Sequence, residues 1–213
     1  AGKIKDVLRA GEGSEQMKLL DNIMLAVEKR KIKYRVLGIT NEEMEGNMFV
    51  PFLDYDNIFF TKVLKDLTHL RTVFGLCTFV ILANREEHIK EQWGGSNLLG
   101  SYLVFGFDKL TYREHLKIQG HTRSDFNHRV VPTYVGQRNW VNRISAKYQL
   151  ADGMLSEFKP QPKVKLVGTN KNCAYEHCSA YVNFFKEFFG VNLKLGNLDS
   201  CKQPEFIEYG TGR

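Results

Sequence analysis

The 213-residue sequence predicts an α+β domain built around a mixed, largely antiparallel sheet. Strand-like and helix-like stretches are mixed without the strict alternation that indicates a doubly wound parallel sheet, and strand-like neighbours recur as in hairpins. Hydrophobic residues make up 43% of the chain, which supports one domain with a substantial core. We therefore expect a single domain over residues 1–213, with residues 1–33 as a helical lead-in and residues 160–213 as an α/β extension packed on it.

The N-terminal elements follow from the spacing of apolar residues. Residues 14–27 carry apolar side chains on one helical face. Residues 34–39 and 48–54 are typical of strands, although Pro51 removes one backbone donor from the second. Helical spacing returns at residues 58–70.

The central elements include the most apolar part of the chain. Residues 72–83 contain a continuous apolar run, which is typical of a strand buried on both faces. A further strand is predicted at residues 101–107, a helix at residues 108–118 and a strand at residues 140–145. The segments between them are polar or rich in His, Arg and turn residues and are expected to be loops: 84–97 and 120–137.

The C-terminal part begins with a segment that contains Pro160 and Pro162, so residues 153–163 are expected to form a linker or long loop. Four elements are predicted after it: a strand at 164–167, an aromatic helix at 175–189, and strands at 191–195 and 206–209. The aromatic residues of this helix indicate a buried face rather than a platform for stacking bases.

The charge and the absence of a membrane signal narrow the class of protein. The net charge of +6 favours a polyanionic partner, of which nucleic acid is the commonest, although a solvated basic surface gives the same total. No apolar run approaches the roughly 20 residues of a membrane span, and the N-terminus lacks the apolar core of a signal peptide. We expect an intracellular protein (cytoplasm, nucleoid or nucleus) that is not secreted.

The four cysteines are too few and too scattered to predict a disulfide framework. Cys77 lies in an apolar run and is interpreted as a buried thiol, whereas Cys173, Cys178 and Cys201 could pair or bind metal. The spacing of these three cysteines with His177 matches no established zinc pattern. Reduced thiols are therefore the expectation.

The strongest motif is Asp54-Tyr55-Asp56 at the end of an apolar strand. Residues two apart on a strand share a face, so both carboxylates are expected to converge. Divalent cations such as Mg²⁺ relieve the repulsion between such carboxylates, and a pair of ions can catalyse phosphoryl transfer. The alternative is that Asp54 ends the strand and Asp56 caps the next helix. Polymerases, nucleotide-sugar transferases and phosphatases all use this motif.

A third carboxylate would strengthen a metal site. Asp125, flanked by His121 and His128, is one candidate, and Asp108, at the end of a predicted strand, is the other. Asp125 is equally suited to a turn, and Asp108 is well placed to start a helix.

The stretch Trp140-Val-Asn-Arg-Ile-Ser-Ala-Lys147 supplies cations. On a strand, Arg143 and Ser145 share one face and Lys147 continues it. Two cations at this spacing could contact a triphosphate or a nucleic-acid backbone. An edge strand with solvated charges is the alternative.

The order of these features resembles the archaeo-eukaryotic primase (primase-polymerase) superfamily over residues 34–148, with an echo at residues 205–210. The resemblance implies that Asp54, Asp56 and Asp125 hold catalytic Mg²⁺ or Mn²⁺ and that Arg143 or Lys147 contacts nucleotide phosphates. It also implies a core like an RNA-recognition-motif sheet, flanked by a smaller α/β unit.

The sequence departs from this family at a nucleotide-binding motif. The family carries Ser-x-His at the start of a central strand, and the position matched here is Gly100-Ser101-Tyr102. Tyr102 thus stands where the family's His is expected, and His88 is not preceded by the required Ser. Ser101 and Tyr102 are nevertheless the positions where the resemblance implies nucleotide binding, in altered form.

The leading hypothesis is a template-dependent nucleotidyltransferase, a DNA primase/polymerase. It would act on single-stranded DNA and nucleoside triphosphates, with other replication proteins as further partners. One alternative is a non-catalytic nucleic-acid-binding replication module. Another is a Mn²⁺-dependent nucleotide-sugar transferase, which is disfavoured because the first 50 or so residues do not resemble a nucleotide-binding βαβ unit.

Overall fold

The computed structural model describes most of the chain as an α+β fold. Every strand pair in its two larger sheets is antiparallel, and the short pair β11–β12 is parallel, so the predicted class is confirmed. The expected helix at residues 14–27 and the loop at residues 84–97 lie outside the described residues. Those residues are 34–43, 48–83, 99–126, 128–130, 140–144, 147–151, 154–159, 163–167, 173–199 and 204–209.

The central sheet contains four strands in the order β10-β4-β5-β3. Strand β3 (Phe52–Phe59) leads directly into helix α3 (Phe60–Phe74), which packs on one face of the sheet. All five residues of β4 (Phe79–Ala83) are buried, as a continuous apolar run predicts for a central strand. Strand β5 (Leu99–Gly106) and strand β10 (Lys163–Val167) flank it.

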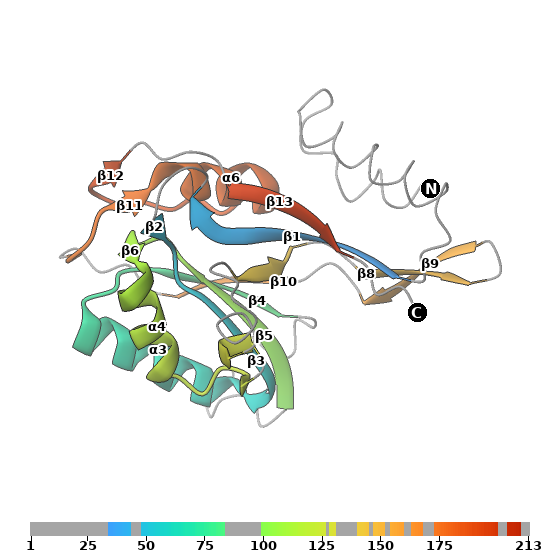
Figure 1. The fold of residues 1–213 in the computed structure, drawn as a ribbon, viewed down its shortest axis with the longest axis horizontal. Coiled ribbons are helices and arrows are strands. Elements are labelled where there is room, and N and C mark those ends of the chain that lie inside the picture. Colours follow the sequence, from blue (N-terminus) through green and yellow to red (C-terminus); the bar gives the residue numbers. More distant parts are fainter. Residues whose placement is uncertain are drawn as a thin grey trace.

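A second sheet is organised around the long strand β1 (Tyr34–Glu43). Figure 1 shows this sheet and helix α6 on the opposite side of the central sheet from α3. The remaining elements are β2 (Met48–Phe49), β6 (Leu110–Thr111), α4 (Tyr112–Gly120), β7 (Val141–Arg143), β8 (Lys147–Ala151), β9 (Met154–Lys159), β11 (His177–Cys178), α6 (Ser179–Phe189), β12 (Leu198–Asp199) and β13 (Pro204–Tyr209).

The core has two parts, one on each face of the central sheet. Leu53 and Tyr55 pack towards α3, whereas Phe52 packs with Trp140 of the second layer and with α6. Because alternate strand residues share a face, Asp54 points to the same side as Phe52. The first acid of the Asp-x-Asp motif therefore lies on the face of the central sheet that is turned towards β1.

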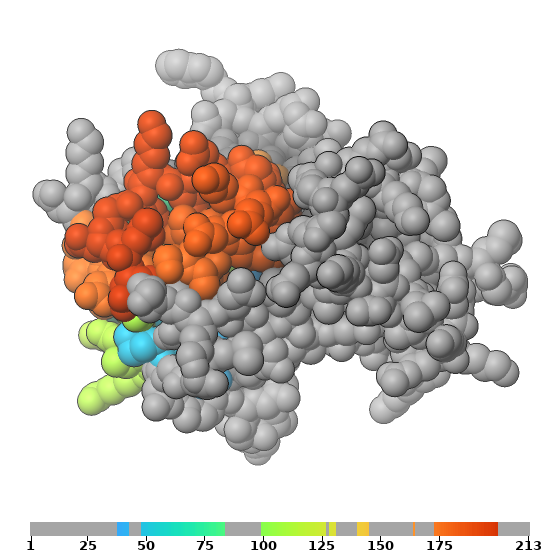
Figure 2. Space-filling view, turned by 90° about the horizontal axis from the view of Figure 1, so that it is seen from above, coloured from blue at the N-terminus to red at the C-terminus, as the bar shows by residue number. Residues whose placement is uncertain are grey.

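Helix α6 joins the second layer through its aromatic residues. The Tyr181 hydroxyl donates a hydrogen bond to the Thr40 carbonyl at 2.7 Å, and the Phe185 ring packs 4.9 Å from that of Phe105. Residues 173–199 form one continuous orange-to-red surface in Figure 2. Strand β10 joins the central sheet and β13 pairs with β1, so described parts of the segment 160–213 belong to both sheets.

Several predicted boundaries are wrong for identifiable reasons. Gly75, at a φ of 71°, caps α3, so the helix runs to Phe74 and the apolar strand begins at Phe79 rather than at residue 72. Thr111 and Glu114 form a capping box that starts α4, so Asp108 does not start it. Two predictions near the C-terminus also fail: residues 153–163 contain β9 instead of a linker, and 191–195 are not a strand.

Pro51 has the disruptive effect that its missing donor predicts. It separates β2 from β3, and its carbonyl accepts a hydrogen bond from the Gly106 N–H at 2.7 Å.

Among the described residues, no helix is long and apolar enough to cross a membrane.

Candidate active site

Asp54 and Asp56 both lie on β3, and Asp56 falls within a bulge that interrupts the regular pairing of β3 with β5. Asp54 is half-buried opposite Leu103 of β5, and the register shifts between Tyr55 and Ile58. Asn57 takes a left-handed φ of 52° there, and Asp56 is exposed. A bulge of this kind redirects side chains and is common beside active sites.

Asp125 is brought to the motif by a backbone contact. Its N–H donates a hydrogen bond to the Asp54 carbonyl at 2.6 Å. Its Oδ1 accepts from the His128 N–H at 3.0 Å, which caps the helical turn that follows. Asp125 therefore does have the turn role considered as an alternative. Its second carboxylate oxygen can still bind another ligand.

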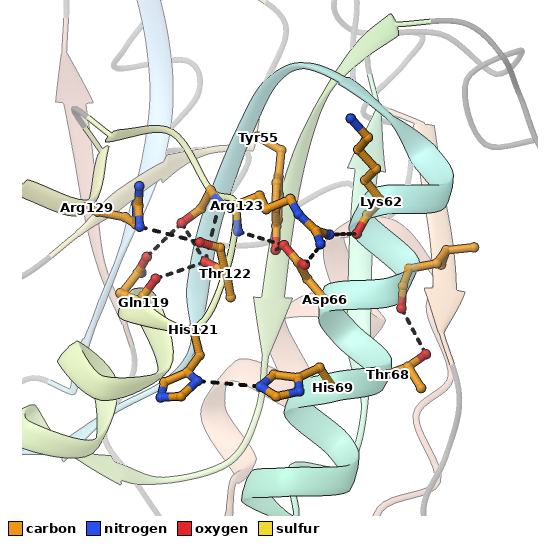
Figure 3. A network of polar contacts seen from close by, with 12 residues as sticks. Tyr55, Lys62, Asp66, Thr68, His69, Gln119, His121, Thr122, Arg123 and Arg129 are labelled. Carbon is orange, nitrogen blue, oxygen red and sulfur yellow. Dashed lines mark hydrogen bonds and ion pairs between the residues drawn. The ribbon is translucent and has the colours of Figure 1, made fainter.

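The loop that carries Asp125 is held in place by buried Asp66 of α3 (Figure 3). The Asp66 carboxylate accepts hydrogen bonds from the Arg123 N–H at 2.7 Å and from the Arg123 guanidinium at 2.8 Å. It also accepts one from the Tyr55 hydroxyl at 3.3 Å, and burial followed by this carboxylate raises the pKa of Tyr55 well above its usual value. Strand β3, helix α3 and the Asp125 loop are therefore joined at one carboxylate.

Helix α4, which directly precedes this loop, also holds it in place. The Gln119 side chain donates to the Phe52 carbonyl and accepts from the Ser124 hydroxyl at 3.2 Å. The Thr122 hydroxyl donates to the Gln119 carbonyl at 3.0 Å and lies 2.8 Å from the Ser124 hydroxyl. Hydrogen-bonded networks of this kind fix backbone positions, so Asp125 is positioned by two helices and a strand.

His128 belongs to this site, although the sequence argument did not assign it a role. Burial lowers the pKa of the His128 imidazole to about 4, and interaction with the Phe52 backbone, followed by attraction to the Asp125 and Asp56 carboxylates, opposes that shift. The His128 carbonyl accepts a hydrogen bond from the Trp140 indole at 2.7 Å. The available signal was its position three residues after Asp125, on the turn that Asp125 caps.

Arg143 lies on β7, which pairs with β1 opposite Gly38. The neighbouring Asn142 amide approaches the Leu53 carbonyl at 3.5 Å, so β7 passes beside β3. Lys147 begins β8, which also pairs with β1, but its side chain and Ser145 lie outside what the structure describes. Of the basic stretch, the structure therefore puts the backbone of β7 near the Asp-x-Asp strand.

Tyr102 does not face the acids. It lies opposite Tyr55 on the α3 side of the sheet, where its fully buried ring packs 5.3 Å from that of Phe60 and burial raises its pKa to about 12. Alternation places half-buried Ser101 and Leu103 on the Asp54 face. The residue directly opposite Asp54 in β5 is Leu103.

Asp108, the other candidate for a third carboxylate, lies beyond the far end of β5 and is fully buried. It accepts hydrogen bonds from the Cys77 N–H at 3.2 and 3.4 Å, and its Oδ1 lies 3.5 Å from His177 Nε2. It therefore belongs to a different cluster from Asp54.

The expectation that Cys77 is a reduced core thiol is wrong in this structure. Cys77 forms a disulfide with Cys173, with the two Cα atoms 5.4 Å apart, and Cys178 is also disulfide-bonded. Gly75 permits this approach, because a Cβ added there would lie 2.9 Å from that of Ala174. The contact joins segments far apart in the sequence, which spacing alone does not reveal.

Two chemically distinct clusters thus emerge. The acidic site comprises Asp54, Asp56, Asp125 and His128, and the cysteine site comprises Cys77, Asp108, Cys173 and His177. Within the described ranges, the group whose three ligand atoms all lie within 4.8 Å of one another is Cys77, Cys173 and His177, and the three acids are not gathered so closely. Comparison of the chain with protein-family models, curated proteins and solved structures finds no match.

Proposed function

We propose that this chain is a template-dependent nucleotidyltransferase, a DNA primase/polymerase. The observation that carries the proposal is the hydrogen bond from Asp125 to the backbone of Asp54. It sets a third acid beside an Asp-x-Asp strand from which it is distant in sequence. A loop fixed by so many buried hydrogen bonds supports a role in positioning that acid.

The donor set suits Mg²⁺ or Mn²⁺. Asp54, Asp56 and Asp125 offer hard carboxylate oxygens, the ligands that these cations prefer, and Asp56 is exposed where an ion can enter from solvent. Divalent ions would stabilise the charge that develops on the attacking and leaving oxygens. The three carboxylates are less closely gathered than the ligand atoms of the cysteine site, so their side chains would have to rotate to bind the same two metal ions.

The protein's own groups would have separate tasks in the reaction. A primer or initiating 3′-hydroxyl attacks the α-phosphorus, a new O–P bond forms, the bond to the β-phosphate oxygen breaks, and pyrophosphate leaves. Arg143 and Lys147 would neutralise the triphosphate. The hydroxyl proton passes to solvent or to a neighbouring base.

The same proposal includes a core like an RNA-recognition motif, a smaller flanking unit and a location inside the cell. The four-stranded antiparallel sheet with α3 on one face supports a core like an RNA-recognition motif. The β1 sheet would form the flanking unit that faces the acids. A polymerase of this kind would act inside the cell, where nucleoside triphosphates and single-stranded DNA are present.

The direct test is synthesis on single-stranded DNA with nucleoside triphosphates and Mn²⁺, with and without a primer. We expect Asp56→Asn to lower the rate about a hundredfold or more, since metal ions contribute several kcal/mol to such reactions. Glu176→Gln, which changes an exposed carboxylate outside the acidic site, is the matched control and should leave the rate unchanged. No synthesis by folded wild-type protein that binds Mn²⁺ would refute the proposal.

A second candidate is a non-catalytic nucleic-acid-binding module. Leu103 opposite Asp54 favours it, because an apolar side chain there cannot hydrogen-bond a nucleotide, and the net charge of +6 is compatible with it. It predicts salt-sensitive DNA binding that survives the double change Asp54→Ala, Asp56→Ala. Equal binding by this variant, together with no synthesis by wild type, would select the second candidate.

A further inference from the structure

The cysteine site gathers metal-ligating groups from three separate parts of the chain. Cys77 precedes β4, Asp108 follows β5, and Cys173 and His177 precede α6. Cys77, Asp108 and His177 are each fully buried. The ligand atoms of the two cysteines and the histidine all lie within 4.8 Å of one another. The fold thus concentrates soft and borderline ligands at one buried point.

The orientation of His177 is that of a metal ligand. Its Nδ1 lies 2.7 Å from the Gly196 carbonyl, which can only accept, so Nδ1 carries the hydrogen. Its buried Nε2 has no hydrogen-bond partner. A carbonyl that fixes the remote ring nitrogen, so that the other nitrogen is directed at the neighbouring ligands, is the usual outer-shell arrangement of histidine in zinc sites.

Asp108 gives the cluster a fourth donor and an electrostatic reason to bind a cation. Its Oδ1 faces His177 Nε2 at 3.5 Å, within the range of an ion pair. A carboxylate buried against a neutral imidazole lone pair is unfavourable unless a positive charge lies between or beside them. The alternative source of that charge is a protonated His177, which would give a buried ion pair.

We propose that Cys77, Cys173, His177 and Asp108 bind one Zn²⁺ when the Cys77–Cys173 disulfide is reduced. A thiol reductant supplies two electrons and two protons: the S–S bond breaks, two protein thiols form, and the reductant leaves as its own disulfide. Zn²⁺ then binds both sulfurs as thiolates and releases two protons. A Cys₂-His-Asp set fits the tetrahedral preference of zinc.

The backbone geometry accommodates both states. Two thiolates on a tetrahedral zinc lie roughly 3.8 Å apart, given Zn–S bonds of about 2.3 Å. The Cα atoms of Cys77 and Cys173 are 5.4 Å apart, so rotation about the two Cα–Cβ bonds changes the sulfur separation without moving the chain. The site would exchange a covalent cross-link for a metal cross-link at the same place in the fold.

The test reduces the full chain with a phosphine and adds Co²⁺ as a spectroscopic probe. We expect one Co²⁺ per chain, with thiolate-to-metal charge-transfer absorption and the intense d–d bands of tetrahedral coordination, and displacement by one equivalent of Zn²⁺. The oxidised chain should give neither signal. Native mass spectrometry should show one zinc and the loss of two protons.

Variants separate this site from other cysteines. His177→Gln should weaken Zn²⁺ binding at least tenfold, whereas Cys178→Ser, which removes the adjacent cysteine, should bind Zn²⁺ as wild type does. If the reduced chain loses its fold, Zn²⁺ should restore it, measured by circular dichroism. The proposal is overturned if the reduced chain neither takes up tetrahedral Co²⁺ nor refolds with Zn²⁺, or if His177→Gln binds equally well.

Discussion

The acidic site and the cysteine site are built on the same central sheet but in opposite ways. At the acidic site, Asp54 is half-buried and Asp56 is exposed, and buried hydrogen bonds hold the loop that carries Asp125 against β3. At the cysteine site, buried groups are joined by a disulfide. Exposed charge on a buried network favours contact with a ligand, whereas a buried cross-link favours stabilisation of the fold.

This difference predicts whether a substitution at each site should change stability or activity. Changes at the cysteine site should alter the free energy of unfolding and leave the proposed DNA synthesis intact at temperatures where the variants remain folded. Changes in the network beneath the acidic site should alter activity more than stability alone explains. The following substitutions test this difference between the two sites and are given in order of decreasing expected effect.

The largest effect is expected from removing the disulfide with the double change Cys77→Ala, Cys173→Ala. Its sequence separation is 96 residues, and disulfides that close long loops stabilise by about 3 to 5 kcal/mol. Denaturant unfolding in the presence of a chelator measures the loss. DNA synthesis by the folded variant should stay close to that of wild type, and a parallel loss of synthesis would show that the two sites are coupled.

A smaller loss is expected from Asp66→Ala. It leaves the buried Tyr55 hydroxyl and the Arg123 N–H without their acceptor, which costs about 2 to 3 kcal/mol, and it frees the Asp125 loop. Unfolding and DNA synthesis are measured together. Asp199→Asn, which removes a carboxylate paired with Lys109 at the other end of the fold, is the control and should cost less than about 1 kcal/mol.

Acid should destabilise the protein through His115. Burial, followed by repulsion from His128, lowers the pKa of His115 to about 3. Between pH 3 and about pH 6.5, the unfolded chain therefore binds more protons than the folded protein does. The free energy of unfolding falls as the pH falls through this range. The expected loss is about 2 kcal/mol between pH 7 and pH 5.

His115→Gln removes this titration and isolates its contribution. The pH dependence of the unfolding free energy should become shallower in that window, although burial of His128 lowers its pKa as well and leaves part of the slope. An unchanged slope would show that the His115 imidazole titrates normally in the folded protein.

The smallest effect is expected from Thr111→Ala at the start of α4. It removes one half of the capping box with Glu114, which costs about 1 kcal/mol. Because α4 leads into the Asp125 loop, synthesis should become more sensitive to temperature, measured as its midpoint of thermal inactivation. Thr68→Ala, an exposed residue on α3 whose hydroxyl bonds only its own helix, is the matched control.

From the sequence alone, the coarse class of fold was predicted correctly, and Asp54 was identified as a candidate metal ligand. Apolar runs and alternation identified β1, β3, β4 and β5, because the periodicity of a strand is local to it. The expectation that Asp54 and Asp56 share a face came from the same rule and stays a prediction, because the bulge after Tyr55 interrupts the regular pairing there. Pro51 marked a real break for an equally local reason, its missing N–H.

Contacts between distant segments were decided by the tertiary structure. The register of β3 against β5 puts Leu103, and not Tyr102, opposite Asp54, and a one-residue choice of register reverses the face of every side chain. Packing between elements also decides three further features. These are the bulge after Tyr55, the hydrogen bond from Arg123 of the Asp125 loop to Asp66, and the disulfide between Cys77 and Cys173. No local pattern encodes these contacts, because each depends on two or more segments whose meeting the whole fold dictates.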